Sequence, residues 1–92
     1  MAQLAAGSVI GIPCEVKPGP FSGERLISFK TMSGVITGFV RDSELRMTNN
    51  NRWLVRAIVQ AINGNEVNVR IRGSFSSTNG LATIPREMAY AA

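Results

Sequence analysis

The stretch from Arg52 to Arg72, RWLVRAIVQAINGNEVNVRIR, decides the fold of this chain. Its second half alternates apolar and polar residues with the period of a β-strand, and the Asn-Gly pair at 63–64 is a strong hairpin signal. Residues 53–62 also fit a helix, because polar side chains recur at near-helical spacing between two capping residues, Asn51 and Gly64. Five of these ten residues are Val, Ile or Trp, however, and these are mediocre helix formers. We therefore predict two strands joined by a tight turn.

The register of this hairpin decides which side chains share a face of the sheet. A two-residue loop at Asn63-Gly64 would turn Arg56 and Gln60 toward the core, and burying a charge without a partner is costly. A three-residue loop, with Gly64 in the left-handed conformation, instead pairs the inward residues with one another: Val67 with Val59, Val69 with Ala57, and Ile71 with Val55. The sequence favours this second register.

The favoured register predicts an outer face that mixes arginines with aliphatic side chains. The first strand contributes Arg52, Leu54, Arg56, Ile58, Gln60 and Ile62, and the second contributes Arg70 and Arg72. Arg56 would stand directly opposite Arg70, and like charges in that position are destabilising. We expect an anion or the acidic and apolar surface of a partner to cover this face. The candidate binding residues are Arg52, Leu54, Arg56, Ile58, Arg70 and Arg72.

The charge distribution points to the same segment. Residues 46–72 hold five arginines and one glutamate, a local net charge of +4, which equals the formal net charge of the whole chain. Eight of the ten basic residues are arginine, whose guanidinium group makes bidentate bonds to carboxylate and phosphate. Only 17% of the residues are charged, against about 25% in an average soluble domain, and this leaves a weakly polar surface suited to a partner.

The rest of the chain also has the pattern of short strands. They are predicted at Val9–Val16, Glu24–Thr31, Val35–Arg41 and Leu81–Ile84, with loops at Lys17–Gly23 and Gly73–Gly80. Within these strands, Pro13 indicates an edge strand or a bend, and Gly38 indicates a bulge or a bend. Ser33-Gly34 is a turn signal, 42–45 reads as one helical turn that places Leu45 in the core, and 86–92 reads as a turn followed by a frayed end.

The 92 residues make one domain. It divides into a first β-unit at 8–47, a polar linker at 48–51 and a second β-unit at 52–90. We predict an all-β fold, either one small, partly open β-barrel or two small β-units packed together.

The residue inventory argues against catalysis. The chain has no histidine and a single cysteine, Cys14, so it offers no usual zinc site, no disulfide within the chain and no Ser-His or Cys-His pair. Its six acidic residues have no paired spacing, and no phosphate-binding loop is present. We predict no enzyme activity, no cofactor and no metal. Cys14 reads as a small buried hydrophobe. Because there is no run of about 18 apolar residues, we expect no membrane span. The free thiol and the absence of an export signal together predict a cytoplasmic protein.

Aromatic residues separate two kinds of partner, because single-stranded nucleic acid usually stacks on exposed rings. Trp53 is expected to point inward, and Phe29 and Phe39 are expected in the core. Phe21 and Phe75 lie in the two glycine-rich loops, where they either plug an end of the barrel or stand exposed for stacking.

Residues 34–45, GVITGFVRDSEL, resemble the closing segment of bacterial Src-homology-3-like domains. In that family a strand ending in glycine, an aromatic residue and valine precedes a short turn and a leucine. The resemblance covers residues 8–47 and implies a small β-barrel. Phe39 stands where tryptophan is commoner, and the acidic and aromatic residues of a proline-rich-peptide groove are absent, so the resemblance transfers no binding residues.

Together these features predict a non-catalytic β-barrel module that binds a protein partner, or a second copy of itself, through the outer face of the 52–72 hairpin. The alternative is a nucleic-acid-binding module that uses the same basic face. A small-molecule substrate is not indicated.

Overall fold

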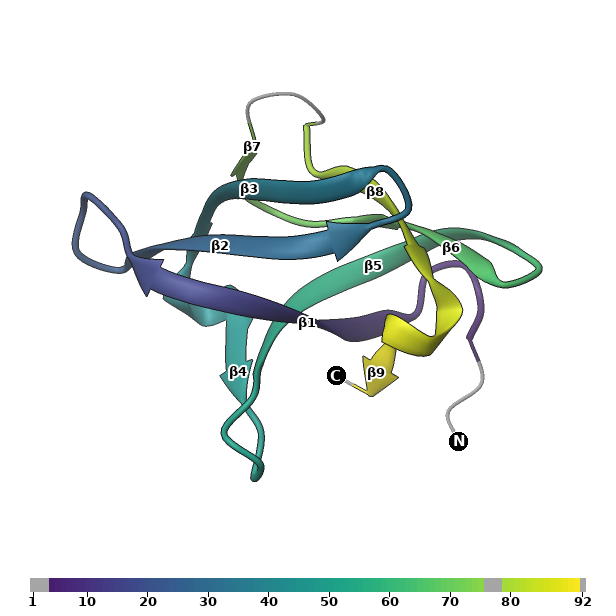
Figure 1. Ribbon diagram of the computed structural model, residues 1–92, viewed down its shortest axis with the longest axis horizontal. Coiled ribbons are helices and arrows are strands. Elements are labelled where there is room, and N and C mark those ends of the chain that lie inside the picture. Colours follow the sequence, from purple (N-terminus) through teal and green to yellow (C-terminus); the bar gives the residue numbers. More distant parts are fainter. Residues whose placement is uncertain (1–3, 76–78, 92) are drawn as a thin grey trace.

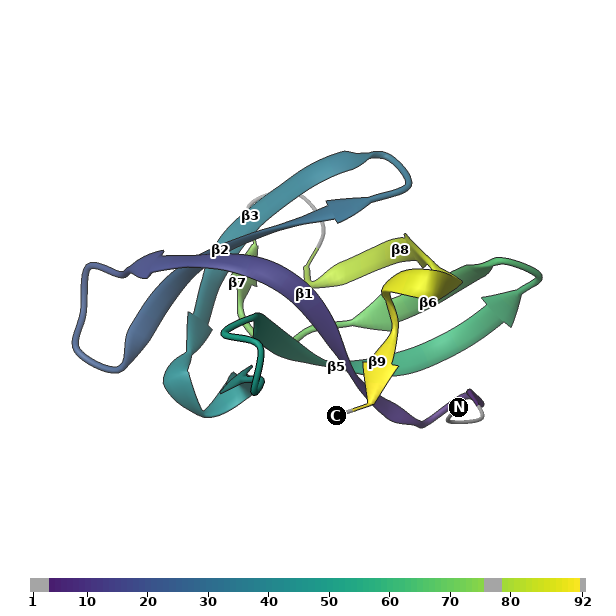
Figure 2. The same cartoon turned by 60° about the horizontal axis from the view of Figure 1, so that its bottom comes forward.

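The chain folds as one antiparallel sheet that curls into a half-barrel, shown by a computed structural model that describes residues 4–75 and 79–91 (Figures 1 and 2). In this part of the chain the strands are β1 (Val9–Pro18), β2 (Glu24–Thr31), β3 (Gly34–Arg41), β4 (Leu45–Met47), β5 (Trp53–Asn63), β6 (Glu66–Arg70), β7 (Ser74–Phe75), β8 (Leu81–Pro85) and β9 (Tyr90–Ala91), and the 3-10 turns are η1 (Asp42–Glu44) and η2 (Arg86–Met88). The strand order is β7-β3-β2-β1-β5-β6-β8, with β4 paired to β5 and β9 to β1. The predicted all-β, partly open barrel is confirmed.

The long strand β1 joins the two halves of the sheet. Residues Val9–Cys14 pair with β5 along one edge, while Glu15–Pro18 pair with β2 along the other, and β9 pairs with Ile10 and Gly11 on that same second edge. β1 is an interior strand over most of its length, but Pro13 lies between the segments that pair with β9 and with β2 and has a neighbour on only one edge. The edge position predicted from Pro13 therefore holds locally, and its missing N–H group is tolerated there.

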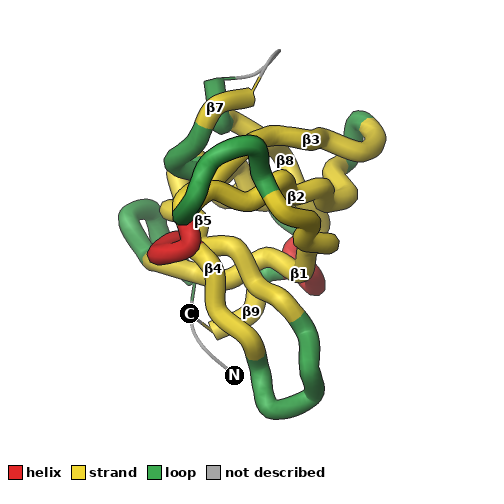
Figure 3. The backbone as a smooth tube through the Cα atoms, turned by 90° about the vertical axis from the view of Figure 1, so that its left-hand side faces the viewer, coloured by secondary structure: helices red, strands yellow, loops and turns green. Residues whose placement is uncertain are grey.

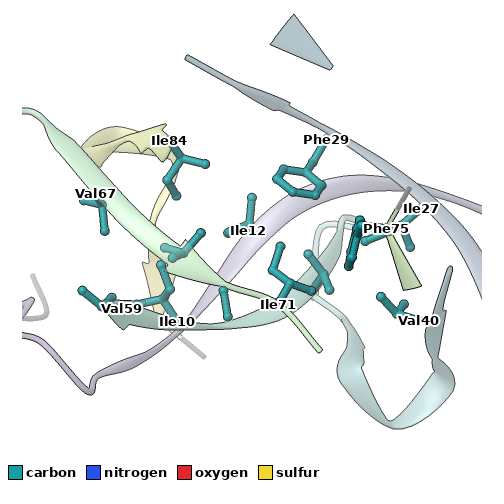
Figure 4. Packing of buried hydrophobic residues seen from close by; sticks show 13 residues of the cluster. Ile10, Ile12, Ile27, Phe29, Val40, Val59, Val67, Ile71, Phe75 and Ile84 are labelled. Carbon is teal, nitrogen blue, oxygen red and sulfur yellow. The ribbon is translucent and has the colours of Figure 1, made fainter. Parts of the chain in front are cut away.

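The core fills the concave side of the sheet (Figure 4). The Phe29 and Phe75 rings meet edge to face, with centroids 6.5 Å apart. Gly38 lies under this pair, and a Cβ atom there would be 2.2 Å from Cδ2 of Phe75. The β2–β3 register runs without interruption from Glu24↔Arg41 to Thr31↔Gly34, so the predicted bulge at Gly38 is wrong. The glycine makes room for a ring.

The hairpin of β5 and β6 is present, which confirms the strand prediction for 53–62, but both predicted registers are wrong. Asn63 pairs with Glu66, so the turn residues are Gly64 and Asn65, and Gly64 supplies the positive φ of 61°. The register then shifts by one residue between Val59 and Ala61. This bulge lies at Gln60, and it turns Ile62 inward against the core, where the sequence analysis had placed Ile62 on the outer face.

The remaining segments agree with prediction in part. β2 has the predicted bounds, and η1 brings a half-buried Leu45 against the core. Residues 48–51 form the loop of the β4–β5 hairpin, which projects from the other strands (Figure 3) and is closed by a 2.8 Å bond from Thr48 N–H to Arg52 O. The predicted frayed end instead contains η2 and β9. Of the predicted loop 73–80, residues 76–78 lie outside the described residues, as does position 92.

Over the described ranges, none of the helical segments has the length and apolar character needed to cross a membrane.

Candidate binding face

The outer side of the sheet carries a row of four residues across four strands. Val9 on β1 pairs with Ile58 on β5, Ile58 pairs with Arg70 on β6, and Arg70 pairs with Leu81 on β8. Directly paired residues project from the same side of a sheet, so these side chains lie next to one another. Val9 and Leu81 are each 45% exposed, Arg70 is exposed and Ile58 is half-buried. The row is therefore an apolar strip interrupted by one guanidinium group.

Arg56 belongs to the adjacent row on the same side. It pairs with Gly11, which in turn pairs with Tyr90. Arg56 is exposed, and the absence of a side chain at Gly11 leaves it little cover from β1. We call Val9, Arg56, Ile58, Arg70 and Leu81 the Arg/aliphatic face.

The predicted opposition of Arg56 and Arg70 is wrong. Arg70 stands opposite Ile58, and Arg56 lies two residues before Ile58 in β5. Both arginines do project from the outer side of the sheet, as predicted, but their charges are one row apart. The physical cause is the turn at Gly64-Asn65 together with the bulge at Gln60, which set a register different from either of those expected.

Leu54 is not an exposed binding residue. It projects to the outer side, but only 3% of its surface is accessible. It packs over Gly11, where an added Cβ atom would be 2.9 Å from Cδ1 of Leu54. With Glu44, Arg46 and Arg56 it lines a small hollow of about 240 Å³. Leu54 thus stabilises the sheet by its burial and lies next to Arg56 in the same hollow.

Arg52 is engaged within the molecule. Its Nη1 donates a 3.1 Å hydrogen bond to the Tyr90 hydroxyl, and its guanidinium carbon is 5.9 Å from the centroid of the Tyr90 ring. Nη2 of Arg46, a residue that the sequence analysis did not select, donates to the carbonyl of Ala91 at 3.0 Å. These two arginines hold the short strand β9 in place.

Arg72 lies apart from the Arg/aliphatic face. It follows the end of β6, is exposed, and lines a separate hollow of about 470 Å³ with Arg41, Ser43 and Ser74. Of the six predicted residues, the fold therefore brings Arg56, Ile58 and Arg70 together, anchors Arg52 to β9, covers Leu54 and separates Arg72.

Two members of the face, Val9 and Leu81, were missed by the sequence analysis. They lie 49 and 23 residues from Ile58 in the sequence, and only the pairing of β1 and β8 with the hairpin brings them into its row. The local sequence carries no signal for that long-range register.

The face is electrostatically unbalanced. All six acidic side chains are within the described residues, and the salt bridge found there joins Arg25 Nε to Asp42 Oδ1 at 2.9 Å. In that part of the chain, neither Arg56 nor Arg70 makes a salt bridge. Both guanidinium groups are thus available to an anionic partner.

The aromatic residues contribute little to this face. Phe29 and Phe75 are buried, Trp53 is half-buried, and Phe21 is 70% exposed in the β1–β2 loop. Of the two loop phenylalanines, Phe75 plugs the core and Phe21 does not. The core prediction for Phe39 is wrong, because its neighbours on β3 face the interior while Phe39 is half-buried on the outer side.

Cys14 lies in β1, as expected, but its thiol is half-buried where a buried side chain was predicted. Desolvation by burial raises its pKa from 9.0 to about 11. The thiol therefore stays protonated at neutral pH and behaves as an apolar group.

Comparisons with known protein families, with curated proteins and with solved structures gave no match to this chain.

Proposed function

We propose that this protein is a non-catalytic binding module that docks an acidic partner protein on the Arg/aliphatic face. The observation that carries the proposal is the row Val9–Ile58–Arg70–Leu81. In it, the half-buried Ile58 and the exposed Leu81 flank a guanidinium group that has no salt-bridge partner in the described residues. Arg56 adds a second such group one row away.

The chemistry of the face fits a protein surface. Burying exposed aliphatic area contributes about 25 cal/mol per Å², and a partner that covers Val9 and Leu81 gains this for both sides. Arginine is enriched in protein interfaces, where its fork of donors matches a carboxylate. A surface that presents carboxylates around an apolar centre is the complement of this face.

A second copy of the chain fits less well than a different protein. A two-fold dimer brings the same patch of both copies together. Arg56 and Arg70 would then meet their own equivalents, and the Arg/aliphatic face contains no acidic residue to offset them. We therefore favour an acidic partner over self-association through this face.

Nucleic acid is the second candidate, since unpaired arginines also bind phosphates. Single strands stack on exposed rings. Tyr90, which is 40% exposed and pairs with Gly11 beside Arg56, already has Arg52 hydrogen-bonded to its hydroxyl and close to its ring. The aliphatic row has no role in contacts with a phosphate backbone. These two points favour the protein partner.

The likeness of residues 8–47 to Src-homology-3-like domains is supported by the curled half-barrel, which is consistent with a small β-barrel. The cytoplasmic location is proposed from the sequence alone, on the unpaired thiol of Cys14.

A capture experiment tests the proposal. The immobilised protein is incubated with native extract, with and without nuclease, and compared with Arg70→Glu and Ile58→Asp. Lys17→Glu is the matched control, because it reverses a charge on an exposed residue of β1 that lies outside the face. We expect one protein to be retained by wild type and Lys17→Glu after nuclease treatment, and lost by the two face variants.

Equal retention by Arg70→Glu and wild type would contradict the proposal. Retention that disappears with nuclease, and that weakens steeply with salt, would favour the nucleic-acid alternative.

A further inference from the structure

A second surface feature lies where β1 and β2 separate. The two strands pair up to Glu15↔Ser28 and then diverge, and β9 reaches only as far as Gly11. Among the described residues, 12–14 therefore pair with β5 on one edge of β1 and with no strand on its other edge. A hollow of about 500 Å³ lies beside the gap, in the size range of about 300–1,000 Å³ that ligand sites occupy.

The inner surface of this hollow is apolar. Phe29, which is 4% exposed, and Met88, which packs against the core, form part of it. Cys14 adds a thiol that remains uncharged at neutral pH. Val35, which is 65% exposed, stands at the mouth. An apolar group of a ligand would lose its hydration against these side chains, and this is favourable.

The rim of the hollow is positive. Lys30 and Arg52 contribute two positive charges, and Glu15 contributes one negative charge. Arg52 donates one hydrogen bond to Tyr90, and a guanidinium group has five N–H donors, so Arg52 can also donate to a neighbouring anion. The rim therefore favours a carboxylate placed next to the apolar group.

We propose that this hollow is an anchor site for the partner protein, which inserts an apolar side chain flanked by a carboxylate. The inference rests on the proposed function, since Arg52 and Tyr90 connect the hollow to the row that contains Arg56. Interface energy concentrates in a few side chains that fill pockets in this way. The occupant is a protein segment and not a free small molecule, because a lining residue as exposed as Val35 shows that the hollow is open to solvent, whereas small-ligand sites enclose most of their ligand.

Three probes test the anchor site. They are 3-phenylpropionate, the charge-reversed 3-phenylpropylamine, and the blocked tripeptide acetyl-Glu-Phe-Glu-amide. Amide chemical shifts report where each probe binds, and protection of Cys14 from a thiol reagent gives an independent reading inside the hollow.

We expect the acid and the tripeptide to shift the amides of Cys14, Phe29 and Lys30 and to slow modification of the thiol, whereas the amine does neither. The tripeptide should bind more tightly than the free acid. Lys30→Glu should weaken the tripeptide about fivefold, because it turns an exposed attraction into a repulsion. Lys17→Glu, the same change outside this hollow, should leave binding unchanged.

Equal binding of the amine and the acid, or shifts confined to other parts of the sheet, would overturn the anchor site. Tighter binding of the free acid than of the tripeptide would overturn the assignment to a protein partner. The capture experiment can refute the anchor site without refuting the proposed function. If Lys30→Glu retains the captured protein and Arg70→Glu loses it, only the anchor site is refuted, whereas retention by both variants refutes the proposed function.

Discussion

The contact between Leu54 and Gly11 gives a stability prediction that separates the observed fold from the pattern read in the sequence. Leu54 is 3% exposed although it projects from the outer side of the sheet. Burying a leucine side chain contributes about 1.5–3 kcal/mol, and truncating one to alanine in a core costs about 2–5 kcal/mol. Because Leu54 borders a small hollow that the neighbouring side chains can relax into, we expect Leu54→Ala to cost about 2–3 kcal/mol, near the lower end of this range. For a domain of this size, that lowers the melting temperature by about 10–20 °C.

A double-mutant cycle with Gly11 tests the contact itself. An added Cβ at Gly11 would lie 2.9 Å from Cδ1 and 3.0 Å from Cβ of Leu54, so Gly11→Ala should overpack the pair and cost about 1–2 kcal/mol. Leu54→Ala removes the contacts with Cδ1 and Cγ but keeps the Cβ atom at 3.0 Å, so in that background the cost of Gly11→Ala should fall to about 0.5 kcal/mol. The expected coupling free energy is therefore about 0.5–1.5 kcal/mol.

Urea unfolding followed by the fluorescence of Trp53, the single tryptophan, measures all four proteins. If Leu54 were on an exposed strip, as the alternation of the sequence suggests, Leu54→Ala would change stability by no more than about 0.5 kcal/mol. That result, or an equal cost of Gly11→Ala in both backgrounds, would refute the account of this contact.

Three further predictions follow from the backbone and the thiol. Gly38→Ala places a Cβ 2.2 Å from the Phe75 ring and should cost about 3 kcal/mol or more by displacing it, whereas Thr37→Ala on the exposed side of β3 should cost under about 1 kcal/mol in the same urea titration. Gly64→Ala imposes a side chain on a φ of 61° and should cost about 1–2 kcal/mol, and an unchanged midpoint would contradict the observed turn. The Cys14 thiol, with a pKa of about 11, should react about 100-fold more slowly at pH 8 than a thiol at its ordinary value of 9.0, and a comparison with a model thiol measures this. Between pH 9 and 11 the folded thiol keeps a proton that the unfolded one loses, so the unfolding free energy should fall with pH relative to Cys14→Ala.

The fold class was accessible from the sequence because strand periodicity and turn chemistry are local. Alternation in 66–72, the Asn-Gly pair and the β-branched content of 53–62 sufficed to predict the hairpin, and Phe29 was expected in the core and is buried. These signals depend on residues that lie a few positions apart in the chain, so no knowledge of the other strands is needed.

The register of the hairpin was not accessible, and the composition of the face depends on it. The bulge at Gln60 leaves one residue of β5 without a partner on β6, and this shifts the pairing by one residue. The run 57–62 alternates too weakly between apolar and polar residues to show where the bulge lies. The consequences are that Ile62 turns inward and Arg70 meets Ile58. A glycine at the first of two turn positions is itself a hairpin signal, and it was present at Gly64.

The burial of Leu54 shows a second limit. Alternation predicts the side of the sheet to which a residue projects, and it placed Leu54 on the outer side as observed. Burial on that side depends on Gly11 of β1, whose missing side chain makes room for Leu54, and on Glu44 and Arg46, which line the same hollow as Leu54. Such cover arises from tertiary contacts that periodicity does not encode.

Site-specific photo-crosslinking in native extract measures contact with the Arg/aliphatic face. A photoreactive amino acid replaces Leu81, which is 45% exposed on the row, and in a matched protein it replaces Met32, which is 51% exposed in the β2–β3 turn. We predict that position 81 crosslinks to a protein and that position 32 does not, and that Arg70→Glu abolishes the product. A product from position 32 alone, or one from position 81 that contains nucleic acid and no protein, would contradict docking of an acidic protein on this face.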